Sequence, residues 1–279
     1  MLMRLPRYSH RVASAMPELA EVEWFRKQWD AGRGGEIVDL VSHERNRVFR
    51  ETDVHALREN LIGERLLTSH RRGKRMLFKF SGDNWLGIHL GMTGKIHVQQ
   101  ASYRPAKRDH LVLFQKDRVL VFSDYRQFGR VRFHHGRDEP DWWKSEAPKI
   151  TSSKFDQKFM DGFLDRHRKA PIKAALLMQN GFPGIGNWMA DEILWRAHVL
   201  PSKRIRKLTG KDRHQLLRST KFVVRRSLET LGQDFSDPPR GWLIHQKWKR
   251  AGICPIHRTP LRHATVAGRT TAWCPNCQN

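Results

Sequence analysis

The chain has 279 residues, of which 39% are hydrophobic, so its length and composition allow a packed core and one or two domains. Lysine and arginine outnumber aspartate and glutamate by 52 to 28, which gives a net charge of +24 that is spread along the chain. This charge favours a polyanionic partner, above all nucleic acid. The sequence has no run of about 18 apolar residues that would span a bilayer, so we expect no membrane partner.

The first fifteen residues contain three arginines and no acid, and they lack the hydrophobic stretch of a secretory signal. We expect residues 1–15 to be an extension upstream of the true start at Met16, although their composition also fits a short organelle-type leader. The three cysteines all lie in the last 26 residues. This arrangement favours a metal cluster over a disulfide framework and indicates a reducing compartment.

The spacing of apolar residues predicts a helix over residues 17–32. From residue 36 to residue 135 the pattern changes to short strands separated by turns, with one helix at Asp53–Asn60. The strands are expected at Glu36–Ser42, Arg65–His70, Arg75–Phe80, Trp85–Leu90, Lys95–Gln99, His110–Gln115 and Val119–Ser123. This spacing is typical of an antiparallel sandwich or barrel.

The stretch Gly136–Lys149, with two prolines and mixed charges, reads as a linker. Beyond it the pattern is helical, with helices expected near Phe155–Arg168, Pro171–Gln179, Trp188–Ala197 and Lys211–Leu231. A proline-rich break at residues 237–239 precedes the cysteine segment. The order of strands first and helices second indicates an α+β fold with two domains.

Met16 is followed by Pro17 and Glu18, so removal of a methionine would make Pro17 the N-terminal residue. A terminal proline carries a secondary amine, and an α-amino group with a pKa near ~8 is partly unprotonated at neutral pH. An amine beside a carboxyl group is suited to opening a sugar through a Schiff base. On spacing alone, proline followed by acids is more typical of an ordinary helix start.

Cys254 and His257 form one pair with two intervening residues, and Cys274 and Cys277 form another. Such pairs clasp the two sides of a tetrahedral ion, and thiolate with imidazole suits one structural Zn²⁺. His263 is a spare ligand if His257 faces away. Between the pairs, Thr265–Thr271 has the length of a two-stranded ribbon, with Gly268 and Arg269 expected at its tip.

Glycine-containing loops mark three further places. The segment 182–187 precedes a helix, where backbone N–H groups would bind an anion such as phosphate, although the fragment by itself is more typical of an ordinary interhelical turn. The turns at 89–94 and 124–129 display Met92, Arg126 and Phe128. A methionine or phenylalanine at a loop tip usually packs in a core, but on a basic protein it also serves as a wedge in a base stack.

Taken in this order, the segments from Met16 to the C-terminus resemble the bacterial formamidopyrimidine-DNA glycosylase / endonuclease VIII family. The resemblance implies an N-terminal antiparallel β-sandwich with flanking helices at 16–140. It also implies a helix–two-turn–helix domain at 150–235 and a zinc-finger β-hairpin at 245–279. A cytoplasmic, nucleoid-associated bacterial protein is then expected, acting as a monomer on double-stranded DNA that contains oxidised bases or abasic sites.

The resemblance implies catalytic roles for four residues. Pro17 matches the nucleophile that attacks the sugar C1′ of a flipped nucleotide, and Glu18 matches the general acid. Lys74 matches a lysine that assists the first elimination, and Arg269 matches an arginine that holds the phosphate beside the lesion. Glu21 matches a further acid near the proline. Base release followed by β- and δ-elimination would complete the reaction.

The resemblance also implies DNA contacts. Met92, Arg126 and Phe128 match the residues inserted where the base has left, and they favour the oxidised-purine branch, which removes 8-oxoguanine and formamidopyrimidines, over a pyrimidine preference. The positions that match phosphate-contacting or basic residues are Arg108, Arg168, Lys173 and Asn187.

The sequence departs from the family pattern in several places. Ala20 replaces the second proline of the opening motif, and Tyr125 replaces a proline. Arg108 stands where a histidine is common, and His257 replaces a zinc cysteine. The stretch Gln233–Trp248 is short for the loop that covers an extruded purine, so lesion preference is the least direct inference. A catalytically silent damage-binding protein and a zinc-ribbon RNA-binding protein are the competing hypotheses.

Overall fold

The computed structural model describes residues 16–43, 46–144 and 147–279, so the predicted extension 1–15 lies outside the described residues. The chain divides into two compact units. The sandwich unit comprises residues 16–17, 21–43 and 46–144, and the helical unit comprises residues 18–20 and 147–279. This is the expected α+β organisation, with antiparallel sheets followed by helices and a C-terminal strand pair.

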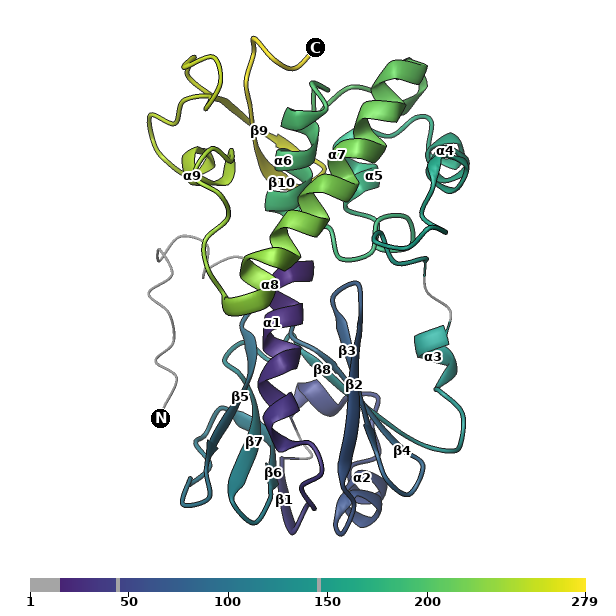
Figure 1. Ribbon diagram of the computed structural model, residues 1–279, viewed down its shortest axis with the longest axis vertical. Helices are drawn as coiled ribbons and strands as arrows, with labels where there is room; N and C mark the ends of the chain where they lie inside the picture. The colour runs from purple at the N-terminus through teal and green to yellow at the C-terminus, as the bar shows by residue number, and fades with distance from the viewer. Residues whose placement is uncertain (1–15, 44–45, 145–146) are drawn as a thin grey trace. The chain divides into compact units, whose positions relative to one another are not determined.

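Two four-stranded antiparallel sheets make up the sandwich unit, so the pattern that allowed a sandwich or a barrel resolves as a sandwich (Figure 1). One sheet has the order β1-β6-β7-β5, formed by β1 (Asp39–Ser42), β6 (Asp109–Phe114), β7 (Arg118–Asp124) and β5 (Gly94–Gln100). The other has the order β2-β3-β4-β8, formed by β2 (Leu66–Arg72), β3 (Arg75–Phe80), β4 (Asn84–His89) and β8 (Arg130–His135).

Short helices complete this unit: α1 (Leu19–Trp29), α2 (Val54–Leu61), α3 (Asp141–Lys144) and the 3-10 turns η1 (Asp30–Gly32) and η2 (Arg47–Phe49). The indole of Trp29 at the end of α1 is fully buried, and its ring centroid lies 4.8 Å from that of Phe78 in β3. Asp53 caps α2 by accepting a hydrogen bond from the backbone N–H of Ala56.

Three expectations for this unit differ from the structure. Strand β8 was missed because only Val131 and Phe133 alternate with arginine and histidine, so the segment lacks a strong apolar signal. The first strand begins at Asp39, and Glu36 makes only an isolated bridge with Arg65. The supposed linker contains α3, whose Trp143 is buried against Leu77 and Trp85.

The helical unit is built from α4 (Gln157–Arg166), α5 (Ile172–Leu176), α6 (Asn187–Arg196), η3 (Ile205–Lys207), α7 (Gly210–Glu229), α8 (Leu231–Asp234) and α9 (Ile244–Lys247). Strands β9 (Arg262–Val266) and β10 (Arg269–Trp273) form a ribbon beside α6 (Figure 1). Helix α6 is buried along nearly its whole length and packs on α7, which starts with a capping box between Thr209 and Asp212.

The four helices expected in this unit correspond to α4, α5, α6 and α7, although their ends differ, and the short helices α8 and α9 were not predicted. Helix α5 is five residues long where nine were expected, because residues 177–186 turn back on themselves toward the start of α6. The search for membrane-spanning segments covered the described residues, and none of their helices combines the length and apolarity needed to cross a bilayer.

Candidate functional site

The carboxylate of Glu18 occupies the N-terminus of α6. Its Oε2 atom accepts hydrogen bonds from the backbone N–H groups of Gly186 at 2.8 Å and Met189 at 3.1 Å, and its Oε1 atom accepts one from Trp188 at 2.9 Å. The side chain is 2% exposed. The anion that the glycine loop at 182–187 binds is therefore a carboxylate of the same chain, and the alternative of a phosphate there does not hold.

Glycine is required at two positions of this loop. Gly184 has a φ of +92°, a left-handed conformation that side chains rarely adopt. A Cβ atom at Gly186 would lie 2.6 Å from Cγ of Glu18, so any larger residue would displace the carboxylate. Gly186 is the N-cap of α6, and Asn187 is the first helical residue.

Pro17 precedes this anchored glutamate directly and is half-buried at the start of α1. Three hydrogen bonds fix the side chain of the neighbouring Glu18. The peptide bond between Pro17 and Glu18 is therefore held in place on the Glu18 side. Glu21, the further acid expected near the proline, is 7% exposed and lies in the first turn of α1. The described residues thus place a proline nitrogen one residue from a fixed carboxylate.

Lys74 lies in the turn of the β2–β3 hairpin, where Gly73 has a φ of +54°. The hairpin is held to α1 by Arg71, whose Nε atom donates to Oε2 of Glu23 at 3.0 Å, and Arg26 binds the same carboxylate. Burial alone would raise the pKa of Glu23, but hydrogen bonds and charge from Arg26 and Arg71 hold that pKa below its ordinary value. Lys74 therefore lies on a braced hairpin.

His89 is a residue of this region that the sequence analysis did not single out. Burial, followed by the charges of Lys74, Arg75 and Arg130, lowers the pKa of His89 to about 4. Its Nδ1 atom accepts a hydrogen bond from the N–H of Gly91 at 3.1 Å, which fits a neutral ring. The only sequence signal was its position at the head of the glycine turn 89–94.

Buried Asp124 organises the two loops that carry the predicted wedge residues. Its Oδ2 atom accepts a hydrogen bond from the N–H of Gly129 at 2.7 Å, and its Oδ1 atom accepts hydrogen bonds from the N–H of Arg126 at 3.2 Å and from the hydroxyl of Thr93. A Cβ atom at Gly91 would meet the backbone of residues 128 and 129, so the two loops touch there. One carboxylate thus fixes both loops.

The wedge residues are presented differently. Phe128 is 39% exposed, and the Arg126 guanidinium lies 4.6 Å from its ring centroid, whereas Met92 is half-buried. Exposed Arg108 stacks on the neighbouring loop, with its guanidinium carbon 3.8 Å from the ring centroid of Tyr125. The structure thus brings Met92, Arg126 and Phe128 into adjacent loops.

In the helical unit, Lys173 does not lie at the surface. Its ammonium is fully buried and donates to Oδ1 of Asp191 at 2.6 Å and to the hydroxyl of Thr271 at 2.7 Å. Lys247 binds the other carboxylate oxygen of Asp191. Burial, opposed by Asp191 and reinforced by Lys247, lowers the pKa of Lys173 to about 8. The expectation that Lys173 contacts a DNA phosphate is therefore corrected: its ammonium is enclosed and joins α5, α6 and β10.

Asn187 also supports the ribbon, because its Nδ2 atom donates to the carbonyl of Thr270 at 3.0 Å. Ala267 and Gly268 both have positive φ angles, which form the tight turn of the β9–β10 hairpin. Arg269 is exposed immediately after this turn, as the first residue of β10 rather than at the tip itself. Arg168 is exposed after α4, and its carbonyl accepts a hydrogen bond from the N–H of Arg206.

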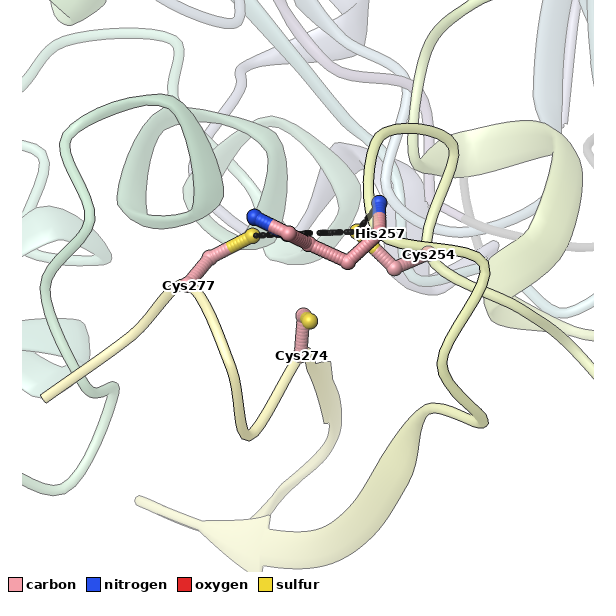
Figure 2. Close-up of side chains that lie close together, drawn as sticks. All are labelled: Cys254, His257, Cys274 and Cys277. Carbon is pink, nitrogen blue, oxygen red and sulfur yellow. Dashed lines mark hydrogen bonds between the residues drawn. The ribbon is translucent and has the colours of Figure 1, made fainter.

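The predicted metal ligands form one cluster, in which all four donor atoms lie within 4.8 Å of one another (Figure 2). The sulfur atoms of Cys254 and Cys277 are 3.7 Å apart, and Cys254 Sγ lies 3.8 Å from Nδ1 of His257. Two ligands at tetrahedral positions around zinc would be separated by about 3.7 Å. The donor set and these two distances fit a four-coordinate metal ion, whereas His257 Nδ1 lies 2.8 Å from Cys277 Sγ, closer than two ligands of one ion would be. His263 instead contacts the carbonyl of Lys247, so the spare ligand is not used.

Two family models match the chain: the formamidopyrimidine-DNA glycosylase N-terminal domain over residues 16–131, and the formamidopyrimidine-DNA glycosylase H2TH domain over residues 147–237. The chain belongs to the formamidopyrimidine-DNA glycosylase family. It is 35% identical over 276 residues to the formamidopyrimidine-DNA glycosylase of Thermus thermophilus, an alignment that covers 94% of this chain and 98% of the relative. The relative from Carboxydothermus hydrogenoformans is 28% identical over 274 residues and is covered completely, with 94% of this chain aligned.

Solved structures agree with this assignment. The Lactococcus lactis enzyme in complex with DNA containing an abasic site superimposes with a TM-score of 0.84 at 27% identity, covering 94% of this chain and 99% of that one. The same enzyme with DNA containing an oxidised pyrimidine has a TM-score of 0.85 at 28% identity, covering 94% and 100%. The protein is thus a DNA glycosylase of the class that acts in base excision repair.

Proposed function

We propose that this protein is a bifunctional DNA glycosylase and abasic-site lyase that removes oxidised purines, 8-oxoguanine and formamidopyrimidines, through a Schiff base on Pro17. The observation that carries the proposal is the carboxylate of Glu18, fixed on the N-terminus of α6 one residue after that proline. The Lactococcus relative has been captured with DNA containing Fapy-dG, which is a ring-opened purine lesion.

In the proposed reaction the nitrogen of Pro17 attacks C1′ of the damaged nucleotide, and the bond from C1′ to the base breaks with the electron pair leaving on the base. The base then takes up a proton. Opening of the sugar ring gives an iminium ion, from which β-elimination expels the 3′ phosphate and δ-elimination the 5′ phosphate. Each elimination removes a sugar proton and a phosphate leaving group, so no oxidant or reductant is needed.

Glu18 has an electrostatic role in this scheme. Three N–H donors and the positive end of the α6 dipole favour its ionised form. A fixed negative charge beside the reacting nitrogen stabilises the positive charge of the iminium ion as it forms. This geometry supports charge stabilisation more directly than the donation of a proton, the role that the family resemblance implies.

The proposal requires that the nitrogen of Pro17 is a free secondary amine. While Met16 remains attached, that nitrogen is a tertiary amide and cannot act as a nucleophile. We therefore propose that translation starts at Met16 and that this methionine is removed. If residues 1–15 stay attached, the alternative is a catalytically silent clamp for damaged DNA.

The remaining groups would bind the duplex. Lys74, on its braced hairpin, would assist β-elimination, and exposed Arg269 would hold the phosphate beside the lesion. The loops fixed by Asp124 would insert Phe128 and Met92 into the space left by the flipped nucleotide, with Arg126 beside them. A single chain carries all these groups, so we propose that a monomer binds the double-stranded DNA.

We propose Zn²⁺ as the occupant of the cysteine–histidine cluster. Three thiolates and one imidazole are ligands that zinc prefers, and four protein ligands leave no open position for substrate, so the ion would be structural. Cys254 and His257 precede β9, whereas Cys274 and Cys277 follow β10. The metal would therefore close the base of the hairpin that carries Arg269.

An excision assay tests the function. Protein beginning at Pro17 is incubated with duplexes that contain 8-oxoguanine, a formamidopyrimidine or an oxidised pyrimidine, and both base release and strand cleavage are measured. We expect the purine lesions to be released fastest, with cleaved products that carry phosphate at both ends of the gap. Protein that retains residues 1–15 is the matched control and should bind the duplex without releasing a base. Equal activity of the two forms would contradict the role of Pro17.

A further inference from the structure

The outer face of one sheet in the sandwich unit carries a row of basic side chains. Arg75 of β3 is paired with His89 of β4, and His89 is paired in turn with Arg130 of β8. Directly paired residues of antiparallel strands point to the same face of the sheet, with Cβ atoms about 5 Å apart. The alternating residues Met76, Ile88 and Val131 are buried in the core. The row therefore lies on the face away from that core.

A cavity of about 400 Å³ opens on this face. Arg132 lies two residues beyond Arg130 on the same face, and Arg50 closes one side by donating to the carbonyls of Arg47 and Gly129, both at 2.9 Å. The indole of Trp142 forms part of the wall, and a side chain at Gly87 would collide with it. The exposed ring of Phe128 also lines the cavity.

The cavity is strongly positive. Its lining, which lies entirely within the described residues, includes four arginines and one histidine but no acidic side chain. Glu51 neutralises part of this charge from outside, since it binds both Arg130 and Arg132. Burial and then the charges of Arg132 and Arg130 lower the pKa of Arg75, as expected for like charges held close together. An anion bound among them would relieve this repulsion.

We propose that this cavity binds a phosphate group, held by the guanidinium groups of Arg75 and Arg130. Guanidinium forks match phosphate oxygens in geometry and stay charged at all physiological pH values. The phosphate would be a backbone phosphodiester of the bound duplex, an assignment that rests on the proposed function, because Phe128 of the wedge loop lines the same cavity. A free nucleotide offers the same chemistry, with its base against Trp142.

The test compares Arg130→Gln and Arg75→Gln with Lys116→Gln. Lys116 is exposed in the turn before β7, at the opposite end of that strand from Asp124 and the wedge loop, so its variant matches the loss of charge without touching the cavity. In Arg130→Gln, Glu51 still has Arg132 as an ion-pair partner, so no carboxylate is left without one. A further variant, Arg130→Lys, keeps the positive charge at this position. Circular dichroism checks folding, and two separate glutamine variants keep the test decisive if one does not fold.

Affinity for a duplex with a tetrahydrofuran abasic analogue is measured by anisotropy between 50 and 200 mM KCl. Each phosphate contact contributes about 0.9 to the slope of log affinity against log salt. We expect this slope to be less steep by about one unit in both glutamine variants. Between 50 and 200 mM KCl, their affinity should therefore fall about 3.5-fold less than that of the wild-type protein. Lys116→Gln and Arg130→Lys should keep the wild-type slope.

A second arm titrates dTMP by calorimetry. Unchanged slopes together with dTMP binding that is lost only in the cavity variants would assign the site to a free nucleotide. Unchanged slopes without such binding would overturn the proposal. Base release by the wild-type protein is measured in parallel, so failure of the glycosylase function is distinguished from failure of the cavity assignment.

Discussion

Replacement of Glu18 by glutamine should destabilise the protein strongly, because the carboxylate accepts three backbone hydrogen bonds at the start of α6. Glutamine keeps the length of the side chain but offers only one acceptor oxygen, and its NH₂ group would face N–H donors. A hydrogen bond to a charged group contributes about 1.5–3 kcal/mol, and the α6 dipole adds up to about 1 kcal/mol. Because some N–H groups keep a partner, we expect a loss of about 3 kcal/mol.

The assay is urea unfolding followed by circular dichroism, with the free energy of unfolding extrapolated to water. Glu229→Gln is the control, since it removes the same charge from α7 at an exposed surface pair with Arg226 and should cost less than about 0.5 kcal/mol. If Glu18→Gln were as stable as this control, the carboxylate would not be anchored as described. Its proposed role beside Pro17 would then lose its structural basis.

Two other predictions concern His89 and the metal cluster. The pKa of His89 is lowered to about 4 in the folded protein, so the native state binds fewer protons than the unfolded state between about pH 4 and 6.5. The free energy of unfolding should therefore fall as the pH drops through this window, by about 3 kcal/mol for this residue. The variant His89→Gln should lack this part of the pH dependence. A His89 ring that titrates near 6.5 by NMR would refute the prediction. For the metal, elemental analysis should find about one zinc per chain, lost in Cys274→Ser but retained in His257→Cys, which supplies an equally suitable ligand. Removal of the metal by a chelator should weaken duplex binding. If binding is unaffected, the metal does not stabilise the hairpin that carries Arg269.

Local signals in the sequence were enough to predict much of the molecule. Alternating apolar residues located seven of the strands, and the spacing of the cysteines and His257 located the metal cluster, because both patterns act over a few residues. The turns at 89–94 and 124–129 were recognised as loops from their glycines. Their mutual contact through Asp124 was not predicted, since it joins segments about thirty residues apart.

The missed features depend on distant partners. Glu18 and Gly186 are 168 positions apart in the chain, so nothing in the glycine loop reveals that its anion is a carboxylate of the same protein. Lys173 is buried because Asp191 and Thr271 meet it there, although lysine is usually exposed. The strand β8 was missed because arginines and histidines alternate with its few apolar residues, and Arg130 and Arg132 line a cavity.

The most direct test of the central claim is to locate the covalent bond formed with DNA. Protein beginning at Pro17 is incubated with a duplex that contains an abasic site, the imine is reduced with borohydride, and the cross-linked peptide is sequenced by mass spectrometry. We predict a single adduct on the nitrogen of Pro17. An adduct on a lysine such as Lys74, or no adduct from protein that binds the duplex, would contradict it.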